Sequence, residues 1–591
     1  MAAASRKSSV AQKSVGPSQR WATTPNILAL IASGLAIAVY LGALKFPFVY
    51  DDLPQILRNP RVQEWFYLPQ YFTHGVWAQV GGRSDNYYRP LFLAWMLLNF
   101  KVFGTDPTGW HFTGLVLHAL VTWLVYSVAV RELQDKLAAG FAAIIFALHP
   151  IHVESVTWVA GANEPLCAAF FLTTVLCYFR WREGDGKEWL VASLACFVLS
   201  ILAKETAIVA PGMIFLCEWM GRAKEEWSPR MRASLLTIVP YAGLVAVYFG
   251  AREFALRDTV PTIVASKASL LLTLPEVMWF YIKQLVYPRQ MALIYPFTPI
   301  SRPGAWNFVL PLLALIAGGV GLWIWMRRDQ RAKAACAWML IPLLPPLAAI
   351  ARFRHDDLVH DRYLYLPSFG FSMLVAIALR RILVGDRKLF GIPAAQAAVL
   401  TLLGVVLGFA TVRQMVYWSS ELAVYNRAVA ISPNNVLALN LLGCHLSDVG
   451  EDDRAVIYLE RALYVDPENY RALVALGSAE NNLRHYDRAI NILLHALKLE
   501  PDDGAVLFFL GVAQLGANRL SDAEASLRRS IQLVPGQSRQ HYVLGLVLMK
   551  EGWLLEAREE FLTELKVNPA PDARARIHEI DLRLAKGAPA S

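Results

Sequence analysis

Residues 46–59 read FPFVYDDLPQILRN and follow directly on the first long apolar segment, at about 26–44. Two adjacent carboxylates, Asp51 and Asp52, are therefore expected at a membrane surface, beside Phe48 and Tyr50. An ionised carboxylate near a medium of low dielectric is costly, so acidic residues in such a place are candidates for function. The alternative is a solvated loop or a helix cap, in which the pair does no chemistry.

The composition of the chain changes near residue 415. The 591 residues are 56% hydrophobic and 17% charged, whereas charged residues make up about 25% of a soluble protein. Long apolar runs fill residues 26–415, after a polar and basic stretch at 1–25, and residues 416–591 are polar with a helical pattern. The sequence predicts an all-α protein with a cytoplasmic tail, a polytopic membrane domain and a soluble domain.

The apolar segments and their flanking charges predict a topology. A spanning helix needs about 20 residues. About eleven apolar segments are interpreted as spans, at 26–44, 111–130, 137–149, 163–180, 188–203, 206–220, 234–250, 306–326, 335–351, 367–384 and 392–412, although 137–149 and 206–220 are short for a span. Two weaker segments, 90–103 and 270–287, are expected to lie on the membrane or dip into it. This solution puts every basic cluster on the cytoplasmic side, although counts between about ten and thirteen stay open.

With this topology the unusual polar residues gather on the outer face. They fall in the first outer loop, 45–110, in the loops 150–162, 251–305 and 352–366, and in the turn at Lys204 and Glu205. The inner loops hold mainly Lys, Arg and their counter-charges. The N-terminus is therefore expected in the cytoplasm, and the site and the C-terminal domain outside, with a bacterial inner membrane favoured. The first apolar segment lacks a clear cleavage site and is interpreted as a retained anchor.

Charge and cysteine usage exclude several classes of protein. The net charge is +9, but many basic residues stand in short loops between apolar runs, which indicates topology rather than nucleic-acid binding. Six cysteines show no CxxC spacing, so the sequence predicts neither a disulfide framework nor a zinc site.

The C-terminal part is built from a repeat. Prolines recur every 34 residues, at Pro433, Pro467, Pro501, Pro535 and Pro569. A Leu-Gly pair marks each first helix, with its glycine at Gly443, Gly477, Gly511 and Gly545, and an alanine marks each second helix, at Ala455, Ala489, Ala523 and Ala557. This pattern resembles the tetratricopeptide repeat. It implies an α-solenoid whose groove binds peptide or protein, with a purely structural or dimerising solenoid as the alternative. Residues 416–432 are interpreted as a half repeat, and 572–591 as a cap and tail.

Other polar stretches supply candidate ligands of a substrate. Residues 149–166 read HPIHVESVTWVAGANEPL and contain His149, His152, Glu154 and Glu164. These residues do not share one clear helix face, so contact with a phosphate or sugar is favoured over a metal site, which stays an alternative. Lys204 and Glu205 form a charged turn whose simpler explanation is a snorkelling lysine with its partner.

The last outer loop is rich in cations. Residues 352–368 read RFRHDDLVHDRYLYLPS and contain Arg352, Arg354, His355, Asp356, Asp357, His360, Asp361, Arg362, Tyr363 and Tyr365. Arginine and histidine in this loop, together with Arg89, could neutralise a phosphate diester. A lipid-linked sugar phosphate would then lie with its tail in the bilayer and its head among these groups. A carboxylate would take the proton of an acceptor hydroxyl, and a single displacement would invert the sugar.

The order of these motifs resembles a known family. PFVYDD, YYRPL, HPIHVESV, AKE, HDRYLYLPS and the repeats follow one another as in the transmembrane and tetratricopeptide-repeat O-mannosyltransferases and their bacterial relatives, within the GT-C superfamily. The resemblance implies a polyprenyl-phosphate-sugar donor, Asp51 as the catalytic base and Asp52 as its orienting neighbour. Some relatives carry a metal-binding aspartate pair where this chain has His152, Glu154 and Glu164, so a divalent metal is left open. The donor-binding set is then Arg89, His149, His152, Glu154, Glu164, Lys204, Glu205, His360, Arg362 and Tyr365.

Three functions compete at this point. The leading hypothesis is an inverting integral-membrane glycosyltransferase that modifies protein hydroxyls, with the repeats recruiting the acceptor. A transporter or flippase of lipid-linked sugars would place ionisable residues in mid-bilayer, where this chain has few. A non-catalytic scaffold gives no reason for the polar motifs to share one side. The sequence leaves the identity of the sugar and of the acceptor open.

Overall fold

The computed structural model describes residues 27–78, 87–257, 267–349, 358–382, 387–389, 391–568 and 571–586. Most of these residues are helical, which confirms the predicted all-α class. The strands in this part of the chain are β1 (Lys388–Leu389) and β2 (Ile392–Pro393), which pair in one antiparallel hairpin. The predicted basic tail and the loop residues Arg352, Arg354, His355, Asp356 and Asp357 lie outside the described residues.

The chain divides into two compact units. The first contains the chain up to Leu293 together with Phe297–Ser420, and the second contains Ile294–Pro296 and the chain from Glu421 onward. The predicted boundary, at 416, therefore lies near the start of the second unit. The tripeptide joins that unit although it lies far away in sequence, and the Ser432 hydroxyl donates to the Ile294 carbonyl oxygen at 2.9 Å.

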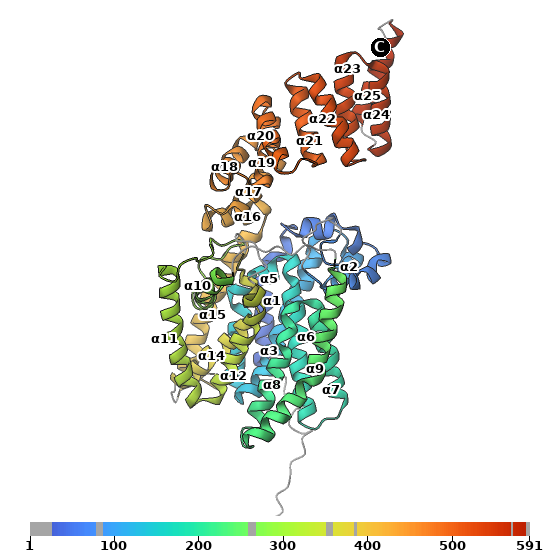
Figure 1. Cartoon of the computed structure of the whole chain (residues 1–591). Coiled ribbons are helices and arrows are strands. Elements are labelled where there is room, and N and C mark those ends of the chain that lie inside the picture. The colour runs from blue at the N-terminus through green and yellow to red at the C-terminus, as the bar shows by residue number, and fades with distance from the viewer. Residues whose placement is uncertain are drawn as a thin grey trace, which may run out of the picture. The chain divides into compact units, whose positions relative to one another are not determined.

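The first unit is a bundle in which the long helices run side by side, roughly parallel or antiparallel to one another (Figure 1). Its helices are α1 (Ile27–Tyr40), α2 (Pro90–Phe103), α3 (Pro107–Leu133), α4 (Lys136–Leu148), α5 (Val153–Thr157), α6 (Asn163–Arg182), α7 (Glu188–Ala203), α8 (Ala210–Gly221), α9 (Trp227–Ala255), α10 (Lys267–Val286), α11 (Trp306–Arg328), α12 (Gln330–Leu340), α13 (Leu344–Ala349), α14 (Pro367–Ile382) and α15 (Ala394–Met415).

Six described helical segments are long and apolar enough to cross a membrane. They are Ile27–Lys45, Pro107–Leu133, Val159–Arg182, Trp227–Ala255, Trp306–Arg328 and Ala394–Trp418. The pair Lys136–Leu148 and Pro150–Thr157 makes a seventh if its 50° bend interrupts a single span. The predicted count of about eleven is thus not confirmed. The other four predicted segments form helices α7, α8, α12 and α14, which are only 11 to 16 residues long.

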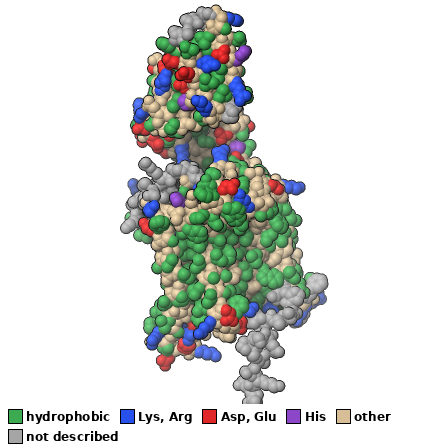
Figure 2. Space-filling model, turned by 90° about the vertical axis from the view of Figure 1, so that its right-hand side faces the viewer, with side chains coloured by type: hydrophobic (Ala, Val, Ile, Leu, Met, Phe, Trp, Pro, Cys, Tyr) green, Lys and Arg blue, Asp and Glu red, His purple; other side chains and the backbone are tan. Residues whose placement is uncertain are grey.

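The outward-facing helices of the first unit expose apolar side chains. Only 6% of the apolar window of α11 and 17% of that of α9 is buried, against 83% for Val159–Arg182. The exposed side chains include Leu235, Val239, Val247, Leu313, Ile316, Val320, Leu402, Val405 and Phe409. Figure 2 shows a broad hydrophobic surface over this unit. Because soluble proteins rarely expose so large an apolar surface, this surface supports a multi-pass membrane unit.

Two ion pairs show that basic loops meet at one end of the bundle. Arg131, near the end of α3, contacts Glu183 just after α6. Arg380, near the end of α14, contacts Asp135 just before α4 at 2.9 Å. The opposite ends of α4 and α6 carry the polar motifs of residues 149–166. In α4 and α6 the basic and the polar motifs therefore lie at opposite ends.

The second unit is a series of helix pairs. After α16 (Glu421–Ile431) come the pairs α17 (Val436–Asp448) and α18 (Asp452–Val465), α19 (Tyr470–Asn482) and α20 (Tyr486–Leu499), α21 (Gly504–Gly516) and α22 (Leu520–Leu533), and α23 (Gln540–Glu551) and α24 (Leu554–Val567), followed by α25 (Pro571–Ala585). Asn435, Asn469 and Asp503 cap the first helices of three pairs through side-chain hydrogen bonds to backbone N–H groups.

The repeated glycines let the two helices of each pair approach closely. A Cβ atom added to Gly443, Gly477 or Gly511 would lie 2.6 Å from a leucine on the second helix of the same pair. At Gly545 the neighbour is Phe561, at 2.9 Å. These distances are shorter than van der Waals contact, so the Leu-Gly pattern has a packing cause.

We expect Gly477→Val to destabilise the second unit by about 1–3 kcal/mol, because the new side chain overlaps Leu493. Hydrogen exchange of α19 and α20 in the full chain would measure the loss. Arg471→Val on the exposed side of α19 is the matched control, since it introduces the same β-branched residue without a clash. Equal exchange in both variants would contradict the packing explanation.

Candidate functional site

The two adjacent aspartates point in different directions. Tyr50 has a φ of 54°, a left-handed conformation that bulky residues rarely adopt. After this turn, the carboxyl group of Asp52 is fully buried and accepts hydrogen bonds from Val49 N at 3.1 Å and Ala160 N at 2.8 Å. Asp51 is half-buried and lines a cavity. Strained backbone of this kind persists only where its surroundings enforce it, and it is frequent at functional sites.

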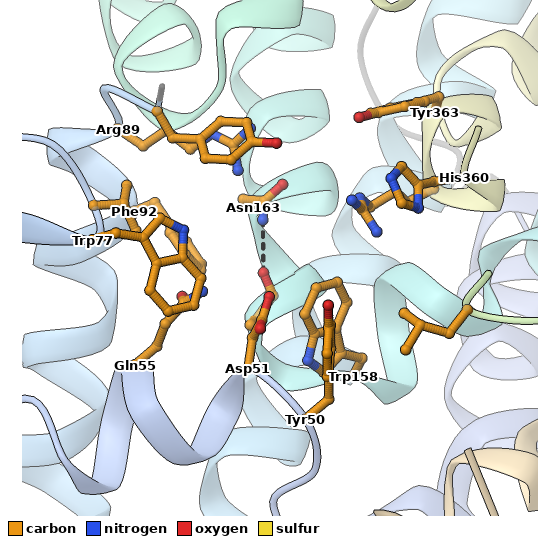
Figure 3. Close-up of a pocket in the computed structure, with 15 residues that line it drawn as sticks. Tyr50, Asp51, Gln55, Trp77, Arg89, Phe92, Trp158, Asn163, His360 and Tyr363 are labelled. Carbon is orange, nitrogen blue, oxygen red and sulfur yellow. Dashed lines mark hydrogen bonds between the residues drawn. The ribbon is translucent and has the colours of Figure 1, made fainter. Parts of the chain in front are cut away.

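The cavity lies at the end of the bundle that carries the polar motifs, and its volume is about 210 Å³. Four of the residues predicted from the sequence line it: Asp51, Arg89, His360 and Arg362. In Figure 3, Asp51 points toward Asn163, with Arg89 and His360 on either side. Its other lining residues are Tyr50, Gln55, Val76, Trp77, Tyr87, Phe92, Trp158, Ala160, Asn163, Leu293 and Tyr363.

Arg89 is held by a carboxylate that does not itself line the cavity. Its Nε and Nη2 atoms donate to the two oxygens of Glu205, at 2.9 and 2.6 Å. The guanidinium also lies 4.4 Å from the centre of the Tyr87 ring. Burial opposes ionisation of Glu205, but Arg89 and Lys204 outweigh it and lower the pKa of Glu205 to about 2. The pair therefore stays ionised at neutral pH, and Nη1 of Arg89 is not engaged by Glu205.

Arg362 is held in the same way. Its Nη1 pairs with Glu154 Oε1, and its backbone N–H donates to Glu154 Oε2 at 2.9 Å. Its guanidinium carbon lies 5.4 Å from the ring centres of both Trp158 and Tyr363. Two contacts from Glu154 and two aromatic rings thus fix the direction of this cation at the cavity wall.

A third ion pair lies behind the wall. Lys204 Nζ pairs with Glu164, and both side chains are almost completely buried, at 1% and 8% exposed. Lys204 also lies 5.1 Å from the centre of the Tyr363 ring. Glu154, Glu164 and Glu205 therefore each neutralise a cation from outside the cavity, while Arg89 and Arg362 face into it.

His360 is a neutral member of the wall. Burial lowers the pKa of His360 well below its ordinary value, and the charges of Arg362 and Lys204 lower it further. A neutral imidazole at this position can exchange hydrogen bonds with a substrate but adds no charge.

The structure places three predicted donor-binding residues behind the cavity rather than on its wall. His149 Nε2 is 2.9 Å from the Leu285 carbonyl oxygen. His152 Nε2 lies 3.2 Å from the Ser368 hydroxyl, and the His152 ring packs against Tyr365 with centroids 4.6 Å apart. These three side chains lie in a buried aromatic cluster, and none is among the residues that line the cavity.

Among the described residues, no group of three or more His, Cys, Asp and Glu side chains is arranged to hold a metal ion. His152, Glu154 and Glu164, which left a divalent metal open in the sequence, are instead committed to Ser368, Arg362 and Lys204.

Several wall residues were not singled out from the sequence. Asn163 stands one position before Glu164, and Trp158 lies within the same motif. Gln55 lies four residues after Asp51, which places it one helical turn further along the same face. Proximity to the predicted carboxylates is the signal that could have found them.

The buried carboxyl of Asp52 should make stability depend on pH. Burial raises the pKa of Asp52 to about 8, although the N–H groups of Val49 and Ala160 oppose the shift. The folded protein then keeps a proton that the unfolded chain releases, so stability falls as pH rises from about 4 to about 8. We expect Asp52→Asn, which stays neutral, to reduce this loss by more than about 1 kcal/mol. Thermal unfolding in detergent at several pH values measures the effect, and identical profiles for variant and wild type would refute it.

Family models match two parts of the chain. Residues 88–249 match the family model described as dolichyl-phosphate-mannose-protein mannosyltransferase. Residues 438–469 and 481–538 match tetratricopeptide-repeat models. The chain thus combines a mannosyltransferase-like membrane region with tetratricopeptide repeats, as its motifs predict.

Individual relatives are similar over a longer part of the chain. A protein O-mannosyl-transferase of Caenorhabditis elegans is 26% identical over 432 residues, which cover 72% of this chain and 60% of the relative. The human protein O-mannosyl-transferase TMTC3 is 26% identical over 474 residues, covering 72% of this chain and 50% of the relative. The predicted resemblance to the transmembrane and tetratricopeptide-repeat O-mannosyltransferases is confirmed. The chain spans about 50% to 60% of the length of these relatives.

Two solved structures that are similar to this chain each cover about a third of it or less. The tetratricopeptide-repeat protein TTC0263 of Thermus thermophilus is 18% identical, with 32% of this chain and 96% of that chain covered and a TM-score of 0.25. MamA of Desulfovibrio magneticus is 21% identical, with coverages of 26% and 86% and a TM-score of 0.24.

Proposed function

We propose that this protein is an integral-membrane glycosyltransferase of the GT-C type that moves a hexose, mannose by relationship, from a polyprenyl phosphate to a protein hydroxyl. The observation that carries the proposal is one cavity lined by the Asp51 carboxylate and by the guanidinium groups of Arg89 and Arg362. A carboxylate and two cations could also serve acyl or phosphoryl transfer. The match of residues 88–249 to the mannosyltransferase model favours sugar transfer.

The reaction follows from the groups at the wall. The acceptor oxygen attacks the anomeric carbon of the sugar while Asp51 takes the hydroxyl proton. The bond between this carbon and the phosphate oxygen breaks, and polyprenyl phosphate leaves with the electron pair. Arg89 and Arg362 stabilise the charge on the departing phosphate. Because this is a single displacement, the configuration of the anomeric carbon inverts.

Two glutamates position Arg89 and Arg362 for this reaction. Glu205 and Glu154 bind Arg89 and Arg362 from behind, so the cations are already oriented before the donor arrives. Preorganised charges of this kind stabilise a transition state without reorganisation at the moment of reaction.

The repeats and the membrane topology complete the proposal. Helix pairs of the tetratricopeptide type present a groove for extended peptides, so the second unit recruits the acceptor protein. The site and the repeats face away from the cytoplasm, because the basic loops at the opposite end of the bundle are retained inside.

Sugar transfer by the purified full chain in detergent tests the proposal. The donors are polyprenyl phosphates that carry mannose, glucose or galactose, and the acceptors are peptides with and without serine and threonine. Mass spectrometry should find one added hexose on hydroxyl-containing peptides only, and NMR should find an inverted anomeric centre. No transfer from any of these donors, together with binding of peptides to the repeats, would favour a scaffold instead.

A further inference from the structure

Three side chains at the cavity wall hold polar atoms without a protein partner in the described part of the chain. These atoms are Gln55 Oε1, Trp158 Nε1 and Asn163 Oδ1. The residues are 6%, 4% and 4% exposed, so bulk water does not solvate them. Buried polar atoms in native proteins are nearly always hydrogen-bonded, and an exception calls for an explanation.

The orientation of Asn163 is fixed by its own amide. Asn163 Nδ2 donates to the Ala160 carbonyl oxygen at 2.6 Å, as the dashed line in Figure 3 shows. This hydrogen bond shows which end of the side-chain amide is the nitrogen, so Oδ1 is the atom that remains available as an acceptor. Ala160 is itself held, since its N–H donates to Asp52. The acceptor at Asn163 is therefore as rigid as the backbone beside it.

Trp158 is held by its neighbours while its N–H stays unused. Its ring stacks on Trp418 at a centroid distance of 5.9 Å and an angle of 23°, and it contacts Tyr50 at 5.8 Å. The Arg362 guanidinium lies over the same ring. An indole Nε1 can only donate, so this position calls for an acceptor.

These groups match the chemistry of a sugar ring. Each sugar hydroxyl carries one donor and two acceptor lone pairs, so a hexose can satisfy an amide oxygen and an indole N–H at once. A phosphate carries no donor for Asn163 Oδ1 when it is fully ionised. The cations Arg89 and Arg362 suit the phosphate, and the neutral set suits the sugar.

We propose that Gln55, Trp158 and Asn163 form the subsite for the hexose of the donor, with Asn163 Oδ1 accepting from one sugar hydroxyl and Trp158 Nε1 donating to another oxygen. The inference rests on the proposed function and adds the residues that recognise the sugar. Gln55 Oε1 accepts from a third hydroxyl.

The consequence is discrimination by single hydroxyls. A site built to hydrogen-bond a hydroxyl disfavours an analogue without it, because the protein group is left unpaired. Among monodeoxy forms of the donor sugar, we expect one to bind about tenfold or more weakly to the wild type. That penalty should vanish in Asn163→Ala, where the acceptor is gone.

Competition binding to the full chain tests the subsite without turnover. Wild type should bind polyprenyl-phosphate mannose more tightly than polyprenyl phosphate, and Asn163→Ala and Trp158→Phe should each reduce this preference by about fivefold or more. Trp325→Phe is the matched control, because Trp325 Nε1 also lacks a partner in the described chain but lies away from this cavity.

The outcomes separate this inference from the proposed function. An unchanged preference for the sugar in both Asn163→Ala and Trp158→Phe overturns the subsite, even if transfer activity is present. Equal weakening of polyprenyl phosphate and its mannosylated form means a structural role for these residues, and it overturns the subsite as well. A sugar preference that the variants abolish, in a wild type that transfers nothing, supports the subsite and rejects the enzyme.

Discussion

Asp51→Asn is expected to lower the turnover of sugar transfer by about 100- to 10,000-fold, the range that a general base contributes. The amide has the shape of the carboxylate but cannot take the proton of the acceptor hydroxyl. Donor affinity should change by less than about threefold, because Arg89 and Arg362 remain in place to bind the phosphate. The measurement is kcat for transfer together with donor binding in the same detergent.

The control for this variant is Glu64→Gln. Glu64 is an exposed carboxylate of the same loop, paired with Lys101 at 3.1 Å, and it does not line the cavity. Its substitution should leave turnover within about twofold of wild type. If Asp51→Asn keeps full activity, Asp51 is not the base. A loss of donor binding equal to the loss of turnover would mean that the carboxylate serves binding rather than proton transfer.

Lys204→Met is expected to destabilise the protein by about 3–5 kcal/mol, because it leaves the buried Glu164 carboxylate without its counter-charge. The double variant Lys204→Met/Glu164→Gln should recover most of this loss, since it removes both charges together. Chemical unfolding in detergent, followed by tryptophan fluorescence, gives the free energies of unfolding of the wild type, of Lys204→Met, of Glu164→Gln and of the double variant. Their coupling measures the pair itself.

An exposed pair provides the comparison. Lys101 and Glu64 have side chains that are 30% and 65% exposed. Lys101→Met should therefore cost less than about 1 kcal/mol. If Lys204→Met costs no more than Lys101→Met, or if the double variant is as unstable as the single one, water reaches the inner pair and the argument from burial fails.

The sequence was informative where a local pattern has one structural outcome. The 34-residue spacing of Pro433, Pro467 and Pro501 and the intervening glycines allow only paired helices in regular succession, and the structure supplies them. Residues that are distant in sequence, such as Asp51, Arg89 and Arg362, were grouped because alternating spans bring outer loops together. They line a single cavity.

The directions of side chains could not be obtained in this way. Nothing in the letters DD says that Asp51 faces the cavity and Asp52 the interior, because the turn at Tyr50 depends on its surroundings. His149, His152 and Tyr365 lie close to the site in sequence, but they fill an aromatic core. A polar residue within a packed bundle can line the site or fill the core, and only its tertiary contacts show which of the two it does.

The number of spans was hard to predict for a related reason. A run of apolar residues does not show where proline interrupts a helix. In residues 335–351 the helix breaks around Pro342, between α12 and α13. Judged by hydropathy alone, residues 335–351 are one continuous apolar segment.

The Ile294–Pro296 tripeptide has a practical consequence for anyone who expresses the repeats alone. A fragment that starts at Glu421 omits the carbonyl of Ile294, and the fully buried Ser432 hydroxyl then loses its acceptor. Such a fragment should fray at α16, and proteases should cut there first. A clone that begins at Asn434 discards the affected helix but keeps the Asn435 cap of α17, and is the better starting point for crystallising the repeats with a peptide.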